Sequence, residues 1–127
     1  MIIWFAQEQL TSCVAACIRM VITGLGQNLT EKQIQHALGS SSIGHTLVQA
    51  YQQMRWLGVD ATLHDDWNLI DLRDCLRDGL HPIVGIDPQF LGHQVSPHAI
   101  VIVAITSQAV KFLDPLGSST PETISSE

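Results

Sequence analysis

The order of hydrophobic and polar positions divides the chain into a helical first part and a strand-rich second part. Small and hydrophobic side chains recur at helical spacing over 13–24 and predict a helix that stops at glycines, with Ser12 as its candidate N-cap. Thr30 and Gln33 have the spacing of a capping box, which predicts a second helix over 30–38.

Two further helices are predicted in the first part. The pattern over 45–57 indicates a third helix that stops at a glycine. A fourth helix begins at Asp66 or Asn68, either of which can act as N-cap, and ends near Leu76. Between these helices, the segment over 59–64 is interpreted as a short strand.

Three compact hydrophobic runs follow and are typical of strands that are buried or centrally paired: 81–87, 98–105 and 109–114. A turn over 106–108 joins the last two runs, and the loop over 87–97 has a length that is often functional in a compact domain. Helices followed by strands predict an α+β fold, with N-terminal helices packed on a C-terminal antiparallel β-sheet.

The composition fits one globular domain. The chain has 127 residues, of which 46% are hydrophobic and 14% are charged, unlike the low hydrophobicity and high charge of disordered chains. We therefore expect residues 1–127 to form a single domain. Its tail over 119–127 is polar and rich in turn residues, which indicates a domain boundary.

The charge balance excludes several classes of partner. The net charge is −6 and only six Lys and Arg residues are present, so we expect no binding to nucleic acid or anionic membranes. No hydrophobic run reaches the about 18 residues of a membrane span, and the first residues lack the basic region of a signal peptide. These features predict a cytoplasmic protein, or a piece of a larger one, whose three cysteines are thiols.

Cys13 is the candidate nucleophile. It lies in the first turn of the first predicted helix, where unpaired N–H groups and the helix dipole favour a thiolate and can bind an oxyanion. The alternative is a small buried residue, because Cys13 shares a stripe with Ala16, Cys17 and Met20. Cys17 and Cys75 have no comparable position, and we expect no catalytic role for them.

A nucleophilic thiol needs a base and a residue that orients the base. His98 opens one hydrophobic strand and Asp114 ends the next. If these strands form a hairpin, the two residues become near cross-strand neighbours, with the carboxylate bound to Nδ1 of the imidazole. The alternatives are an interfacial histidine and a turn residue before proline. His93, in the preceding loop, is the rival base.

Two further site predictions concern the oxyanion hole and metals. Gln7 lies six residues before Cys13, and its side-chain amide can add an oxyanion donor, although a surface glutamine is the alternative. The cysteines and histidines show no CxxC or HxxxH spacing, so we expect neither a metal site nor a cofactor.

These residues resemble one known family. The segment over 7–21, QEQLTSCVAACIRMV, resembles the opening of cysteine peptidase family 39, the bacterial, bacteriocin-processing double-glycine leader peptidases, where a glutamine precedes the catalytic cysteine by six residues. The helix over 30–39, the sequence PHAIVIVAI and the sequence DPLG over 114–117 resemble later elements of the family in their order.

The resemblance implies a papain-like fold and a cysteine-type endopeptidase. Cys13 would attack the scissile carbonyl, His98 would act as base and Asp114 would orient it, while Gln7 and the Cys13 amide would form the oxyanion hole. The implied substrate is a leader or precursor peptide cut after small residues such as Gly-Gly. If the chain is part of a larger protein, its partner would be a transporter or another domain.

The sequence departs from the family at two positions beside the nucleophile. Ser12 stands where an acidic residue is usual, and Val14 stands where glycine is usual. The valine favours a substrate other than a leader peptide. The alternatives to leader processing are a non-catalytic peptide-binding module on the same fold and a papain-like effector or toxin that cuts other proteins.

Overall fold

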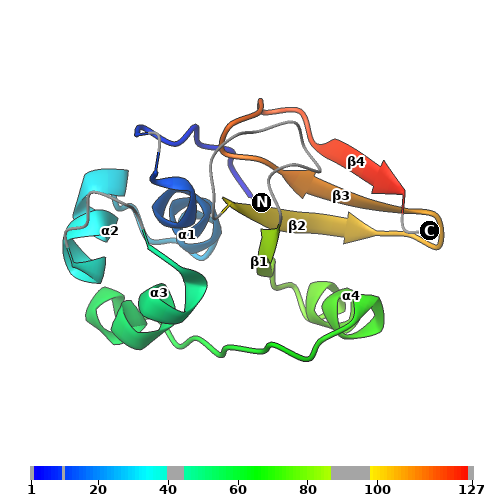
Figure 1. Ribbon diagram of the computed structural model, residues 1–127, viewed down its shortest axis with the longest axis horizontal. Helices are drawn as coiled ribbons and strands as arrows, with labels where there is room; N and C mark the ends of the chain where they lie inside the picture. The colour runs from blue at the N-terminus through cyan, green and yellow to red at the C-terminus, as the bar shows by residue number, and fades with distance from the viewer. Residues whose placement is uncertain (1, 10, 40–44, 87–97, 126–127) are drawn as a thin grey trace.

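The computed structural model describes residues 2–9, 11–39, 45–86 and 98–125. Within these ranges the fold is α+β, as predicted, with the first helices gathered at one side of a sheet and the last helix beneath it (Figure 1). The helices are α1 (Cys13–Gly24), α2 (Glu31–Leu38), α3 (Leu47–Gln53), the 3₁₀ helix η1 (Met54–Leu57) and α4 (Leu69–Arg77). The strands are β1 (Ile83–Ile86), β2 (His98–Ile105), β3 (Ala109–Leu113) and β4 (Glu122–Ser125).

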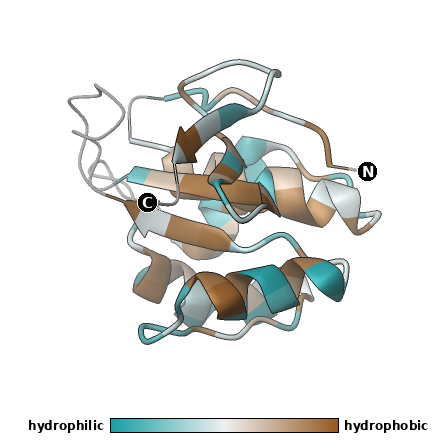
Figure 2. Cartoon of the chain, turned by 90° about the vertical axis from the view of Figure 1, so that its right-hand side faces the viewer, coloured by the Kyte–Doolittle hydropathy of each residue, from teal (hydrophilic) through white to brown (hydrophobic). Residues whose placement is uncertain are grey.

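The strands form one antiparallel sheet in the order β1-β2-β3-β4. Different helices cover its two faces, and the central strands are mainly hydrophobic (Figure 2). The sheet residues that join the core cluster containing α1 and α2 are Ala99, Val101 and Leu113. The residues of the opposite face, against which Leu76 of α4 packs, are Ile100, Ile102 and Phe112.

Side-chain caps define the starts of three helices. Thr30 and Gln33 form the predicted capping box of α2, and Thr46 begins α3 in the same way. Asn68, the second of the two candidates, caps α4 through hydrogen bonds to two backbone N–H groups. Ser12 precedes α1, but its side chain makes no cap hydrogen bond. The first turn of α1 therefore lacks the side-chain cap that the sequence predicted.

Two predictions for extended segments are wrong. Residues 59–64 form no strand, because this mostly exposed segment runs between η1 and α4 without pairing to the sheet. Residues 122–125, expected to belong to a polar tail, form β4 at the edge of the sheet. An exposed edge strand tolerates polar side chains, because its pairing uses backbone groups of the neighbouring strand.

The helical core forms around α1. Most residues of α1 are buried, and α1 packs against both β2 and α2. By contrast, α4 contains no buried residue and contacts the sheet mainly through β2. No helix in the part of the chain that the structure describes has the length and hydrophobicity to cross a membrane.

Candidate active site

Cys13 is the first residue of α1 and exposes only 3% of its surface. Since Ser12 does not cap the helix through its side chain, the first-turn N–H groups are not covered by a capping hydroxyl. Val14, whose branched side chain differs from the family pattern, is buried in the hydrophobic core. The helix start therefore holds the sulfur of Cys13 in place, with its neighbour Val14 turned into the protein interior.

His98 and Asp114 meet at the end of the β2–β3 hairpin. Nε2 of His98 lies 2.7 Å from Oδ1 of Asp114, and both side chains are fully buried. This contact confirms that the two residues lie close together. The prediction that Nδ1 binds the carboxylate is wrong, because the contact is made by Nε2.

The register of the hairpin explains why Nε2 makes the contact. Val101 pairs with Leu113, so continuing the register places Asp114 opposite Ile100. His98 lies two residues before Ile100, at the first position of β2. His98 and Asp114 are therefore diagonal neighbours, a separation that long side chains can bridge. The ring nitrogen farther from the backbone spans this distance.

The backbone around Asp114 holds its carboxylate in position. Oδ1 also accepts a hydrogen bond from the N–H of Leu116 at 2.9 Å, and the N–H of Gly117 donates to the carbonyl of Asp114 at 2.8 Å. Asp114 is therefore both a turn residue and the partner of His98. The indole Nε1 of Trp4 donates to the same carbonyl at 2.8 Å. No local pattern indicates this role of Trp4, because 110 positions separate Trp4 from Asp114.

The surroundings of His98 favour its charged form. Burial, the largest influence, lowers the pKa of His98, but side-chain hydrogen bonds with Asp114 and Cys13 and the charges of these groups outweigh it. The net result raises the pKa of His98 from 6.5 to about 9. The structure thus brings together all three residues predicted for catalysis, with His98 hydrogen-bonded to Asp114 and close enough to Cys13 for the thiol to influence its pKa.

The other cysteines have different environments. Cys17 is one turn further along α1 and fully buried, and burial raises the pKa of its thiol well above the ordinary value. Burial also raises the pKa of the Cys75 thiol, with the charge of Asp78 adding to the effect. Both thiols are therefore held in the protonated, less reactive form at neutral pH.

Gln7 lies beside the Asp114 turn, but its side chain is partly engaged. The N–H of Gln7 donates to the carbonyl of Pro115 at 3.0 Å, which ties the segment before α1 to the residue after Asp114. Its side-chain Nε2 donates to the carbonyl of Gln9 at 2.8 Å. His93, the rival base, lies outside the described residues.

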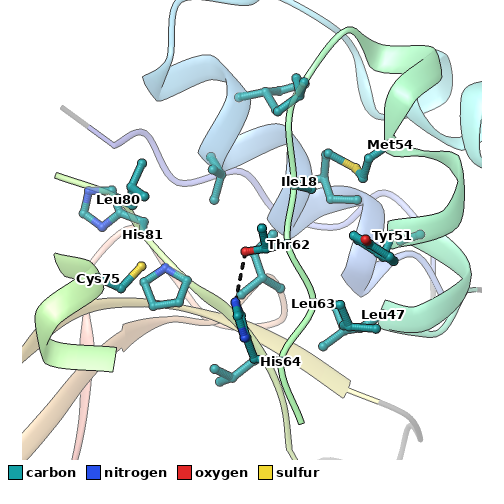
Figure 3. Close-up of a pocket in the computed structure, with 18 of the residues that line it drawn as sticks. Ile18, Leu47, Tyr51, Met54, Thr62, Leu63, His64, Cys75, Leu80 and His81 are labelled. Atoms are coloured by element: carbon teal, nitrogen blue, oxygen red, sulfur yellow. Dashed lines mark hydrogen bonds between the residues drawn. The ribbon is translucent and has the colours of Figure 1, made fainter. Parts of the chain in front are cut away.

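A cavity of about 600 Å³ lies on another side of the molecule, between the α1–α3 side and the β1–α4 side (Figure 3). Hydrophobic side chains dominate its labelled lining, together with His64, Cys75 and His81. Within the described part of the chain, the residues around it do not include Cys13, His98 or Asp114. The described residues also contain no group of three His, Cys, Asp or Glu side chains that can hold a metal ion.

A thiol at a helix start, a charged imidazole and a buried carboxylate form an arrangement that can generate a nucleophile and deliver a proton to a leaving group. No protein-family model matches the chain, and a search of curated proteins finds no match.

Proposed function

We propose that the protein is a cysteine-type endopeptidase of papain-like fold that uses Cys13, His98 and Asp114. The observation that carries this proposal is that His98 hydrogen-bonds a fully buried carboxylate and lies close enough to the helix-start cysteine for that thiol to raise the pKa of His98. Packing alone can account for the burial of each of these three side chains. It does not account for the proximity of a nucleophile, a base and an orienting group that come from three different parts of the fold.

The proposed reaction begins with proton transfer between Cys13 and His98. With Nε2 bound to Asp114, Nδ1 is the nitrogen that takes the thiol proton, which gives a thiolate and an imidazolium. The thiolate attacks the scissile carbonyl carbon and the carbonyl oxygen gains the electron pair. The imidazolium then donates its proton to the leaving amine as the C–N bond breaks. A water molecule, deprotonated by His98, hydrolyses the resulting thioester.

The oxyanion is stabilised by donors near the start of α1. The backbone N–H of Cys13 and the side-chain amide of Gln7 are the proposed donors, and the positive end of the α1 dipole supports them. The bond between Gln7 and Pro115 ties this segment to the turn that carries Asp114. Nucleophile, base and oxyanion donors are thus joined in one hydrogen-bonded unit.

The proposed substrate is a peptide with small residues at the cleaved bond. Cys13 exposes 3% of its surface, which restricts access and disfavours bulky side chains beside the bond. The resemblance to double-glycine leader peptidases supports cleavage after a pair such as Gly-Gly. An effector or toxin would use the same chemistry on other proteins, and the sequence of the cleaved bonds distinguishes the two roles.

The experiment that tests the proposal is digestion of a mixed peptide library by the parent, Cys13→Ala and Cys17→Ala, with products identified by mass spectrometry. We expect the parent and Cys17→Ala to cut the same bonds and Cys13→Ala to cut none. Equal cleavage by the parent and Cys13→Ala, or no cleavage by the parent, would contradict the proposal.

The cavity supports a second candidate function, a non-catalytic peptide-binding module. Its hydrophobic lining includes Tyr51, Leu63, Trp67 and Leu80, whose side chains are partly exposed to solvent. Such a cavity is suited to apolar side chains of a peptide. A parent protein that binds library peptides without cutting them would favour this function over the peptidase.

A further inference from the structure

Glu31 is a buried carboxylate that the proposed reaction does not use. It is the first residue of α2 and exposes 1% of its surface. Both of its carboxylate oxygens lie 3.1 Å from the backbone nitrogen of Glu8, whose N–H they accept. Glu31 therefore contacts the backbone of the segment that leads into the nucleophile, although 23 positions separate the two residues.

Further hydrogen bonds extend this contact toward Cys13. The Ser12 hydroxyl, which is near enough to influence the Glu31 carboxylate, donates to the carbonyl of Gln9 at 3.0 Å, and its oxygen accepts the N–H of Gln9 at 3.0 Å. Gln35, one turn further along α2, donates its side-chain amide to Oε2 of Glu31 at 3.3 Å. The carboxylate thus fixes the backbone at Glu8, and the bonds between Gln9 and Ser12 extend this constraint to the residue immediately before Cys13.

The position of this carboxylate is not explained by stability alone. Burial raises the pKa of Glu31, while the Glu8 N–H and the Ser12 hydroxyl oppose this effect. A raised carboxyl pKa means that ionisation of the group in the folded protein costs stability at pH values above it. Buried ionisable groups that are retained at such a cost are common at functional sites.

We propose that Glu31 is a positioning residue that holds residues 7–12 so that Gln7 and the N–H of Cys13 point at the oxyanion. This inference rests on the proposed peptidase function. Glu31 does not touch the substrate. It acts through the backbone of Glu8, whose neighbour Gln7 is bonded to Pro115 beside Asp114.

The test compares Glu31→Gln with Glu8→Gln in the full chain. Glu31→Gln removes the negative charge and one of the two oxygens that accept the Glu8 N–H, so that a single neutral amide oxygen remains as the acceptor. Glu8→Gln makes the same chemical change on an exposed side chain that pairs with Arg19 and leaves the backbone N–H in place. Because oxyanion donors act mainly in the transition state, we expect Glu31→Gln to lower kcat about 10- to 100-fold with little change in KM. We expect Glu8→Gln to change kcat less than about threefold.

A second measurement does not depend on turnover. Hydrogen–deuterium exchange should be faster over residues 7–12 in Glu31→Gln than in the parent, and unchanged over β2. Glu31→Asp keeps the charge with a shorter side chain, so it should fall between the parent and Glu31→Gln in both measurements. Equal kcat values for parent and Glu31→Gln, or unchanged exchange over residues 7–12, would overturn the positioning role.

The same experiment separates failure of this inference from failure of the peptidase proposal. The pH dependence of Cys13 alkylation should be the same in Glu31→Gln and the parent, because the His98–Asp114 contact is intact. If the parent cuts no peptide, the peptidase proposal fails, and the exchange measurement alone decides whether Glu31 holds the segment. If alkylation shifts together with kcat, Glu31 acts on the nucleophile and not on the oxyanion donors, which contradicts the inference.

Discussion

The start of α1 and the cavity side of the molecule differ in how their side chains are buried and paired. At the start of α1, Cys13, His98 and Asp114 are buried close together, and a hydrogen bond joins His98 to Asp114. Around the cavity, hydrophobic side chains are partly exposed, and α4 has no buried residue. His64, which lines the cavity, stacks on Trp67 and bonds to the hydroxyl of Thr62.

The difference teaches that a large cavity and a reactive site need not coincide. The volume of about 600 Å³ lies where the packing of α4 against the rest of the chain is loose. The reactive groups lie where a helix start and two strand ends converge, which leaves little empty space. The reactive groups of this fold come together where α1, β2 and β3 meet, whereas the cavity is suited to holding apolar groups.

The largest expected effect comes from removing the charge of Asp114. Asp114→Asn keeps the shape of the side chain but cannot stabilise the imidazolium, so we expect kcat/KM to fall about 10²- to 10⁴-fold. The control on the cavity side is Asp74→Asn in α4, whose carboxylate makes an exposed ion pair with Arg77. It should change kcat/KM less than about twofold. If Asp114→Asn kept near-parental activity, the buried carboxylate would matter no more for catalysis than the exposed carboxylate of Asp74.

The second prediction compares stability with one substitution in both regions. Ile34 in α2 is fully buried, whereas Ile70 in α4 is 63% exposed. We expect Ile34→Ala to lower the free energy of unfolding by about 2–5 kcal/mol and Ile70→Ala by less than about 0.5 kcal/mol. Urea denaturation measures both values. Equal losses would show that α4 contributes as much to the core as α2 does.

The third prediction concerns pH. Because the pKa of His98 is raised from 6.5 to about 9, the imidazolium that protonates the leaving amine persists to about pH 9. We expect peptide turnover to fall about tenfold per pH unit above this value, while alkylation by iodoacetamide, which needs only the thiolate, does not fall. The raised pKa also adds stability that is fully present below pH 6.5 and is lost as the pH rises through about 9. A turnover rate that keeps rising above pH 9 would contradict the assignment of His98 as the acid.

The smallest expected effect is on the cavity side. Trp67→Ala enlarges the cavity and removes the stacking partner of His64. Since distant sites are usually independent, we expect the rate of Cys13 alkylation to change less than about twofold. Weaker binding of library peptides by the same variant would assign the cavity to substrate recognition. A tenfold change in alkylation would instead show that the two regions are coupled.

Local signals in the sequence predicted most of the fold. Capping residues such as Thr30 and Asn68 lie within a few residues of the helix starts that they define, so spacing alone locates them. Hydrophobic runs located β2 and β3 for the same reason. The convergence of Cys13, His98 and Asp114 was predictable because Cys13 opens a helix, His98 opens one strand of a hairpin and Asp114 directly follows the other.

Features that depend on distant partners were not predictable from local patterns. The segment over 59–64 has strand composition but finds no strand to pair with, and β4 is polar but pairs with β3. Nε2 contacts Asp114 because of the hairpin register, which includes an irregularity between Ile102 and Ala104. The role of Glu31 depends on a backbone N–H in another segment.

The pH dependence of Cys13 alkylation in the parent and in His98→Ala tests the central claim most directly. If Cys13 forms an ion pair with His98, the parent should react rapidly well below the about pH 8.5 at which a free cysteine ionises, and His98→Ala should shift the profile upward. Cys17, which is buried in the same helix, should not be alkylated in either protein. Identical profiles for the parent and His98→Ala, or a parent that reacts only above about pH 8.5, would contradict the catalytic pair.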